Sequence, residues 1–203
     1  MKKMRPLLLV AACSLLLTSC FDTKNPLSDP QKSKPDDRLS GVWRFRGESG
    51  EMNYYHIGHA GEKLPASIMP VVFVQHTPDG KMQSGELLVF PTTIGDKTYL
   101  NVTEAKPPQL KLLQEKGWTD ETFSEYLLLR YQITGDVLTL QLIDQEAKKR
   151  AVEAGKIKGM SEKDRDGNTR VHVADTTENL AKFVAEAGDT LFSKDVLRLE
   201  RVK

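Results

Sequence analysis

Two tight turns, each flanked by strand-forming residues, limit the folds that this chain can adopt. Gly95-Asp96 separates "FPTTI" from "KTYLNV", and Gly135-Asp136 separates "EYLLLRYQI" from "VLTLQLI". A two-residue connection joins antiparallel neighbours, whereas parallel strands need a crossover of a dozen residues or more. Leu138, Leu140 and Leu142 also alternate with polar residues, as in a strand with one buried face. The centre of the chain therefore predicts an antiparallel sheet.

The same signals predict about eight strands along the whole chain. They cover residues 42–46, 71–75, 86–90, 97–102, 125–133, 137–143, 169–174 and 196–202. Residues 47–69, with several glycines, are interpreted as a long irregular loop. Short connections between successive strands favour an antiparallel order throughout.

Three helices are predicted between these strands, at residues 107–116, 145–154 and 176–187. The third has the clearest pattern, because Leu180, Phe183 and Val184 fall on one helical face and Gly188 suits the end of a helix. The predicted fold class is therefore mainly antiparallel β with helical inserts (α+β).

The N-terminus has the form of an export signal. Met1–Arg5 is basic, and Pro6–Leu17 is apolar but too short to span a bilayer. The segment Leu17-Thr18-Ser19-Cys20 resembles the lipobox of bacterial lipoproteins. The resemblance implies that residues 1–19 are a signal peptide and that Cys20 becomes the N-terminus and carries acyl chains, such as palmitate. Acyl chains on one cysteine would anchor the protein to a membrane without a spanning segment.

The residues after Cys20 bear on location and on domain boundaries. Residue 21 is Phe, whereas Asp at this place marks retention at the inner membrane in enteric bacteria, so the resemblance implies an outer-membrane protein facing the periplasm. Residues 20–37 contain three prolines and little apolar surface, which predicts a flexible tether. Residues 38–203 are predicted to form a single globular β-rich domain.

Charge and cysteine content exclude some classes of protein. Removing the three basic residues of the leader from the 29 in the chain leaves 26 against 28 acidic residues, so nucleic acid is not an expected partner. Cys13 leaves with the leader, and the mature chain then has only Cys20. No internal disulfide is expected, and the domain must be held together by its core.

The first predicted strand begins at Leu39-Ser40-Gly41-Val42-Trp43. Gly41 and Trp43, in an eight-stranded chain whose last strand carries Arg198 and Arg201, resemble the lipocalin or calycin pattern. In that family the tryptophan closes the base of a barrel and an arginine from the last strand packs over it. The resemblance implies a barrel that is filled by side chains or holds one small ligand. The alternative is a core tryptophan in another antiparallel sheet.

The histidines are the remaining candidates for chemistry. His56-Ile57-Gly58-His59 spells a nucleotidyltransferase signature, but the strand before and the helix after it are not predicted, so no nucleotide site is expected. His56 and His59 could share a metal ion only with further ligands, for which His76 and His172 are available. Neither a metal nor a cofactor is expected from the sequence.

Two functional hypotheses from different classes follow. The first is a non-enzymatic envelope lipoprotein whose domain binds a partner protein or a small apolar ligand. The alternative is a periplasmic, hydrolase-like enzyme with a site assembled from distant residues such as His56, His59 and His172. A deep apolar pocket would favour binding, whereas convergent histidines and carboxylates would favour an enzyme.

Overall fold

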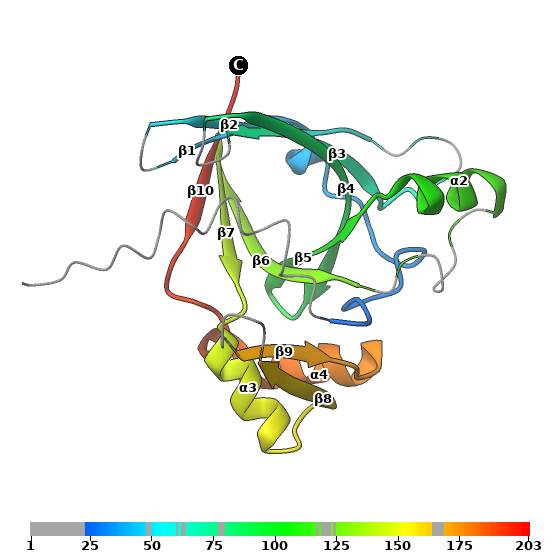
Figure 1. Ribbon diagram of the computed structural model, residues 1–203, viewed down its shortest axis with the longest axis vertical. Coiled ribbons are helices and arrows are strands. Elements are labelled where there is room, and N and C mark those ends of the chain that lie inside the picture. The colour runs from blue at the N-terminus through cyan, green and yellow to red at the C-terminus, as the bar shows by residue number, and fades with distance from the viewer. Residues whose placement is uncertain are drawn as a thin grey trace, which may run out of the picture.

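The structure, a computed structural model, is a closed antiparallel barrel with a smaller layer on one side (Figure 1). It describes residues 23–47, 50–59, 61, 64–76, 80–116, 118, 123, 125–163 and 169–203. The predicted leader and Cys20 lie outside these residues. The barrel strands are β1 (Gly41–Arg46), β2 (Met52–Ile57), β3 (Met69–His76), β4 (Met82–Ile94), β5 (Lys97–Glu104), β6 (Leu127–Thr134), β7 (Val137–Leu142) and β10 (Leu197–Arg201). Their order is β1-β10-β7-β6-β5-β4-β3-β2, with β1 and β2 also paired, so the predicted fold class is confirmed.

The barrel contains one strand that the sequence did not predict, β2, and lacks one that it did, at residues 169–174. Residues 47–69 are not one irregular loop, because β2 lies within them and pairs with β1 on one side and with β3 on the other. Tyr54, Tyr55 and Ile57 are good strand formers, and the glycines of this region flank the strand rather than interrupt it. The predicted strand at 169–174 is β9 (Thr169–Val173), which pairs outside the barrel with β8 (Gly159–Lys163).

The helices follow the predicted positions. They are α2 (Pro107–Lys116), α3 (Gln145–Glu153) and α4 (Thr177–Ala187), with 3-10 turns η1 (Asp37–Leu39) and η2 (Gly188–Leu191). α3 and α4 lie with β8 and β9 in the layer at the bottom of Figure 1. Gly188 ends α4 with a positive φ of 54° and donates its N–H to the Val184 carbonyl. Within the described residues, no helix has both the length and the apolar character that crossing a bilayer requires.

Apolar side chains form two cores, one inside the barrel and one outside it. Trp43, Leu100 and Leu129 belong to the inner core. Phe90 of β4 and Leu128 of β6 face the opposite way and pack in the outer core with α4 and η2. The wall formed by residues 87–92 of β4, by β5 and by residues 127–129 of β6 is therefore buried on both faces, as the unbroken leucines at 127–129 reflect.

The prediction of a flexible tether over residues 20–37 is wrong for its described part. Thr23 is 1% exposed and exchanges two backbone hydrogen bonds with Tyr126, of 3.1 and 2.8 Å. The next residue, Lys24, donates its N–H to the Val173 carbonyl at 2.8 Å. The Leu27 N–H donates to Asn101 Oδ1 at 2.7 Å. The segment has few apolar residues, but backbone hydrogen bonds and one buried leucine hold it. The globular unit therefore includes residues from Thr23 onward, not from residue 38.

Leu27→Ala tests this correction. The side chain is 3% exposed in the outer core, so its removal should lower the free energy of unfolding by about 2–5 kcal/mol. Denaturant titration measures the change. Gln31→Ala, at an exposed position of the same segment, should change stability by less than about 0.5 kcal/mol. Equal stability of the two variants would show that the segment does not pack on the barrel.

Candidate functional site

The centre of the barrel contains an apolar cavity of about 100 Å³. Its lining comes from all eight barrel strands: Phe45, Tyr55, Ile57, Val71, Leu87, Val89, Leu100, Val102, Leu127, Leu129, Leu138, Leu140, Leu197 and Leu199. Alternate residues of a strand point to the same side, so these side chains face inward while their neighbours face outward. The cavity is therefore a direct result of the strand pattern.

The size and chemistry of this cavity limit what it can hold. An apolar cavity of about 150 Å³ stays dry and can bind benzene. Water in a cavity needs two to four polar partners, which a lining of aliphatic and aromatic side chains supplies poorly. The space thus suits a short alkyl chain or a single small ring rather than a polar or bulky molecule.

One end of the barrel is closed by Trp43 and Arg201. The Arg201 guanidinium carbon lies 4.2 Å from the Trp43 ring centroid, and the Trp43 Nε1–H donates to the Leu39 carbonyl at 2.7 Å. Arg201 also donates through Nη1 to the Ser40 carbonyl at 2.5 Å and through Nη2 to the Arg38 carbonyl. Arg201 thus packs over the tryptophan and holds η1 across the barrel base.

Two further residues of the lipocalin resemblance take different places. Gly41 has a φ of +120°, and a Cβ built there would lie 2.7 Å from Arg201 Nη1, so glycine leaves room for the guanidinium. Arg198 is exposed on the outer face of β10, level with Thr139 of β7. It lines a groove on the outer wall and not the closed base.

A carboxylate and a phenol also meet near the closed end. Tyr131 donates its hydroxyl to Asp36 Oδ2 at 2.8 Å, and Arg38 donates to both oxygens of the same carboxylate at 2.8 Å. The Arg38 hydrogen bond lowers the pKa of Asp36, while burial and then the bond to Asp36 raise the pKa of Tyr131. Both pKa values move away from neutrality, which does not suit general acid–base chemistry near pH 7.

The candidate histidines do not come together. His56 is exposed on the outer face of β2, and His59 Nε2 lies 3.1 Å from Ser40 Oγ. His76 Nδ1 lies 3.2 Å from the Met52 carbonyl oxygen, and His172 is on β9 in the separate two-stranded sheet. In the part of the chain that the structure describes, no three His, Cys, Asp or Glu side chains are positioned to share a metal ion.

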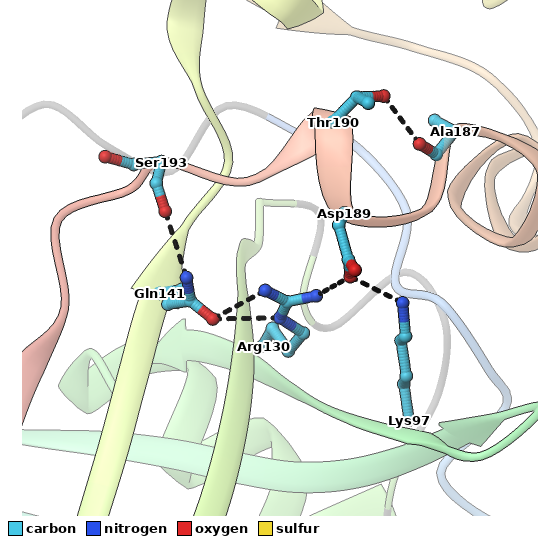
Figure 2. A network of polar contacts seen from close by, with 7 residues as sticks. All are labelled: Lys97, Arg130, Gln141, Ala187, Asp189, Thr190 and Ser193. Atoms are coloured by element: carbon cyan, nitrogen blue, oxygen red, sulfur yellow. Dashed lines mark hydrogen bonds and ion pairs between the residues drawn. The ribbon is translucent and has the colours of Figure 1, made fainter.

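A second candidate site is a polar hollow of about 390 Å³ on the outer wall of the barrel. Asp189 Oδ1 accepts from Lys97 Nζ at 2.5 Å and from Arg130 Nη1, as Figure 2 shows. Arg130 also donates through Nε and Nη2 to Gln141 Oε1, at 3.0 and 2.7 Å. Asp96 also lines the hollow, so two carboxylates face the two cations and leave little unbalanced charge for a ligand.

This network joins the barrel to the outer layer. Asp189 lies in η2, directly after α4, whereas Lys97 and Arg130 are on β5 and β6. The Arg130 guanidinium carbon is also 4.8 Å from the centroid of the Phe192 ring. We therefore assign the hollow a structural role. Its residues are 59 and 92 positions apart in the chain, so no local pattern could have predicted it.

A scan against protein-family models finds no match to the chain, and comparisons with curated proteins and with solved structures find no significant similarity. Fold and side-chain geometry are therefore the basis for assigning a function.

The closed end gives a prediction for a double-mutant cycle. Trp43→Ala should lower the free energy of unfolding by about 3–5 kcal/mol, because it empties a fully buried site. Arg201→Ala should couple with Trp43→Ala by roughly 0.5–2 kcal/mol, the range of a cation–π contact. Arg198→Ala is the matched control, and an equal coupling energy for Arg198 would contradict the closure described here.

Asp189→Asn should loosen the outer layer in a pH-dependent way. The hydrogen bonds from Lys97 and then Arg130 lower the pKa of Asp189, so its contribution to stability is complete above the pKa of an unfolded aspartate, about 3.9. As the pH falls below that value toward the lowered pKa, the contribution is lost. Thermal melts of both proteins should differ most at neutral pH and converge in acid. A difference in melting temperature that is constant from pH 7 to pH 2 would argue against the ion pairs.

Proposed function

We propose that this protein is a lipid-anchored, non-enzymatic component of the bacterial cell envelope whose barrel binds one small apolar ligand. The apolar cavity inside the closed barrel is the observation that carries this proposal. An eight-stranded barrel has an interior wide enough to be filled by side chains or to hold one small ligand. Here the inward side chains leave about 100 Å³ unfilled.

The anchor is proposed from the sequence. The lipobox-like segment ending at Cys20, with a short apolar run before it, supports acylation of that cysteine. Phe21 favours the outer membrane, with the barrel facing the periplasm. An apolar ligand is plentiful at such a surface, because membranes supply acyl chains and small lipophilic molecules.

The geometry favours binding over the hydrolase-like alternative. His56 and His59 lie apart from His172, which is on β9. Ser40 Oγ lies 3.1 Å from His59 Nε2, but this pair is exposed on the surface, and His59 Nδ1 is 4.0 Å from Asp37 Oδ1, too far for a hydrogen bond that would orient the imidazole. The pKa of Asp36 is lowered and the pKa of Tyr131 is raised, so neither group changes its protonation near neutral pH. The cavity also favours a small ligand over a partner protein as the occupant of the barrel, since no protein segment fits a space of this size.

Benzene and hexanol are suitable first probes, because they represent the small ring and the short alkyl chain that an apolar cavity of this size suits. Residues 21–203 labelled on methyl groups should show saturable shifts of the methyls of Val71, Leu129 and Leu199 when either probe is added. Val89→Phe should weaken binding at least about tenfold, because the larger ring fills the cavity at a packing cost of about 1–3 kcal/mol.

The matched control is Val72→Phe, which adds the same ring on the outer face of β3, where Val72 is 45% exposed. It should leave probe affinity unchanged. Absence of saturable shifts in the wild-type protein, or equal affinity in Val89→Phe, would overturn the proposed ligand site.

The anchor has its own test. Cys20→Ser should abolish incorporation of labelled palmitate and move the protein out of the washed membrane fraction, because one cysteine would carry all the acyl chains. Ser19→Ala, which keeps a small residue before the cysteine, should remain acylated. A Cys20→Ser protein that stays acylated would show that the lipid is attached elsewhere.

A further inference from the structure

A groove on the outer wall of the barrel gathers three arginines around one carboxylate. Its volume is about 380 Å³, and it is separate from the apolar cavity and from the polar hollow. The lining residues are Arg44, Arg46, Met52, Val137, Arg198 and Glu200. Neither the lipocalin resemblance nor the barrel cavity requires such a cluster.

Strand alternation places the arginines on one surface. Because Trp43 and Phe45 of β1 face inward, Arg44 and Arg46 face outward and are exposed. Arg198 and Glu200 of β10 are outward in the same way. The antiparallel register of β1 and β10 pairs Arg44 with Glu200. Two residues further along each strand, the same register places Arg46 level with Arg198.

The charges of the groove are not balanced. Arg44 donates through Nη2 and Nε to Glu200 Oε2 at 2.8 and 3.2 Å, so Glu200 is already occupied. Arg46 and Arg198 form no ion pair with any residue that the structure describes. Like charges at level positions on neighbouring strands repel one another. The groove therefore carries an excess of two positive charges at its Arg46 and Arg198 end.

We propose that this groove binds a phosphate-class dianion between Arg46 and Arg198. A guanidinium fork donates two parallel hydrogen bonds to phosphate oxygens, and two facing forks can take one phosphate. A phosphate monoester carries about −1.5 to −2 charges at pH 7, which matches the excess of two, whereas one carboxylate supplies a single charge. This site goes beyond the proposed function and does not depend on a ligand in the barrel.

Two sources carry this chemistry, free inorganic phosphate and the phosphate head group of a lipid. The groove lies close to the apolar cavity, because Phe45 and Leu197, which line the cavity, are the immediate sequence neighbours of Arg46 and Arg198. The experiment has one arm for each source.

The full chain, labelled with ¹⁵N and held in a nonionic maltoside detergent, is titrated with inorganic phosphate. The guanidinium Nε–H resonances report on the site directly. Those of Arg46 and Arg198 should shift and saturate with phosphate but not with chloride at equal ionic strength. If phosphate and chloride produce the same shifts, the groove only attracts anions non-specifically and the proposal fails.

The double variant Arg46→Gln with Arg198→Gln should bind phosphate at least about tenfold more weakly, because it removes both charged forks. Lys156→Gln with Lys182→Gln removes the same charge from exposed positions on the other layer and should bind within about twofold of wild type. Both variants change only exposed residues, and unchanged backbone spectra confirm folding. An equal loss of affinity in the two double variants overturns the proposal.

The source is identified by doping the micelles. Shifts that saturate at lower ligand concentration with phosphatidic acid than with inorganic phosphate identify a lipid head group, and equal affinity identifies free phosphate. Phosphatidylcholine is the control, because its phosphate is a diester balanced by choline.

Tighter binding of a polyglutamate peptide than of phosphate would overturn the proposal in favour of an acidic protein partner. Binding of benzene to the barrel is read from interior methyls, so this site and the barrel site fail independently.

Discussion

The contact of Arg201 with Trp43 joins the first and last strands of the barrel. β1 and β10 are the first and last strands, and their pairing is what converts an open meander into a closed barrel. Closure removes the free edges that would otherwise leave backbone groups unpaired. The guanidinium stacks on the indole and binds two carbonyls of the segment around η1, so the same side chain also covers the barrel base. An interior that is closed at this end can remain dry.

The barrel wall is asymmetric, and this asymmetry divides the molecule into regions of different use. β4, β5 and β6 bury both faces, one in the barrel and one under the outer layer. β1 and β10 bury only the inner face and carry arginines outside. A covered wall is available only for packing, whereas a bare wall is available to ligands and partners. The Lys97–Asp189–Arg130 network belongs to the covered side, and the three-arginine groove to the bare side.

Local features of the chain were predicted well, because their causes are local. The two Gly-Asp turns specify the hairpins of β4 with β5 and of β6 with β7, and the spacing of Leu180 and Val184 specifies α4.

The tether was mispredicted because composition does not reveal backbone hydrogen bonds such as those of Thr23. β2 was not predicted, because it is a short aromatic strand in a region with several glycines, which favour loops. The resemblance to lipocalins narrowed the stacking residue to two arginines, but the choice between Arg198 and Arg201 depends on strand register. The size of the cavity and the Asp189 network depend on contacts between distant segments, which no local pattern encodes.

The bridge at Thr23 has a consequence for how the barrel would sit on a lipid surface. From Cys20 to Thr23 the chain advances three residues, which can extend at most about 11 Å. If acyl chains are attached at Cys20, the segment between bilayer and barrel can be no longer than about the width of a helix with its side chains. The surface around Thr23, Tyr126 and Val173 would then be held close to the lipid head groups, and rotation away from them would require these backbone hydrogen bonds to break. Such a barrel would keep the face around Thr23 toward the bilayer and could not turn freely about its anchor.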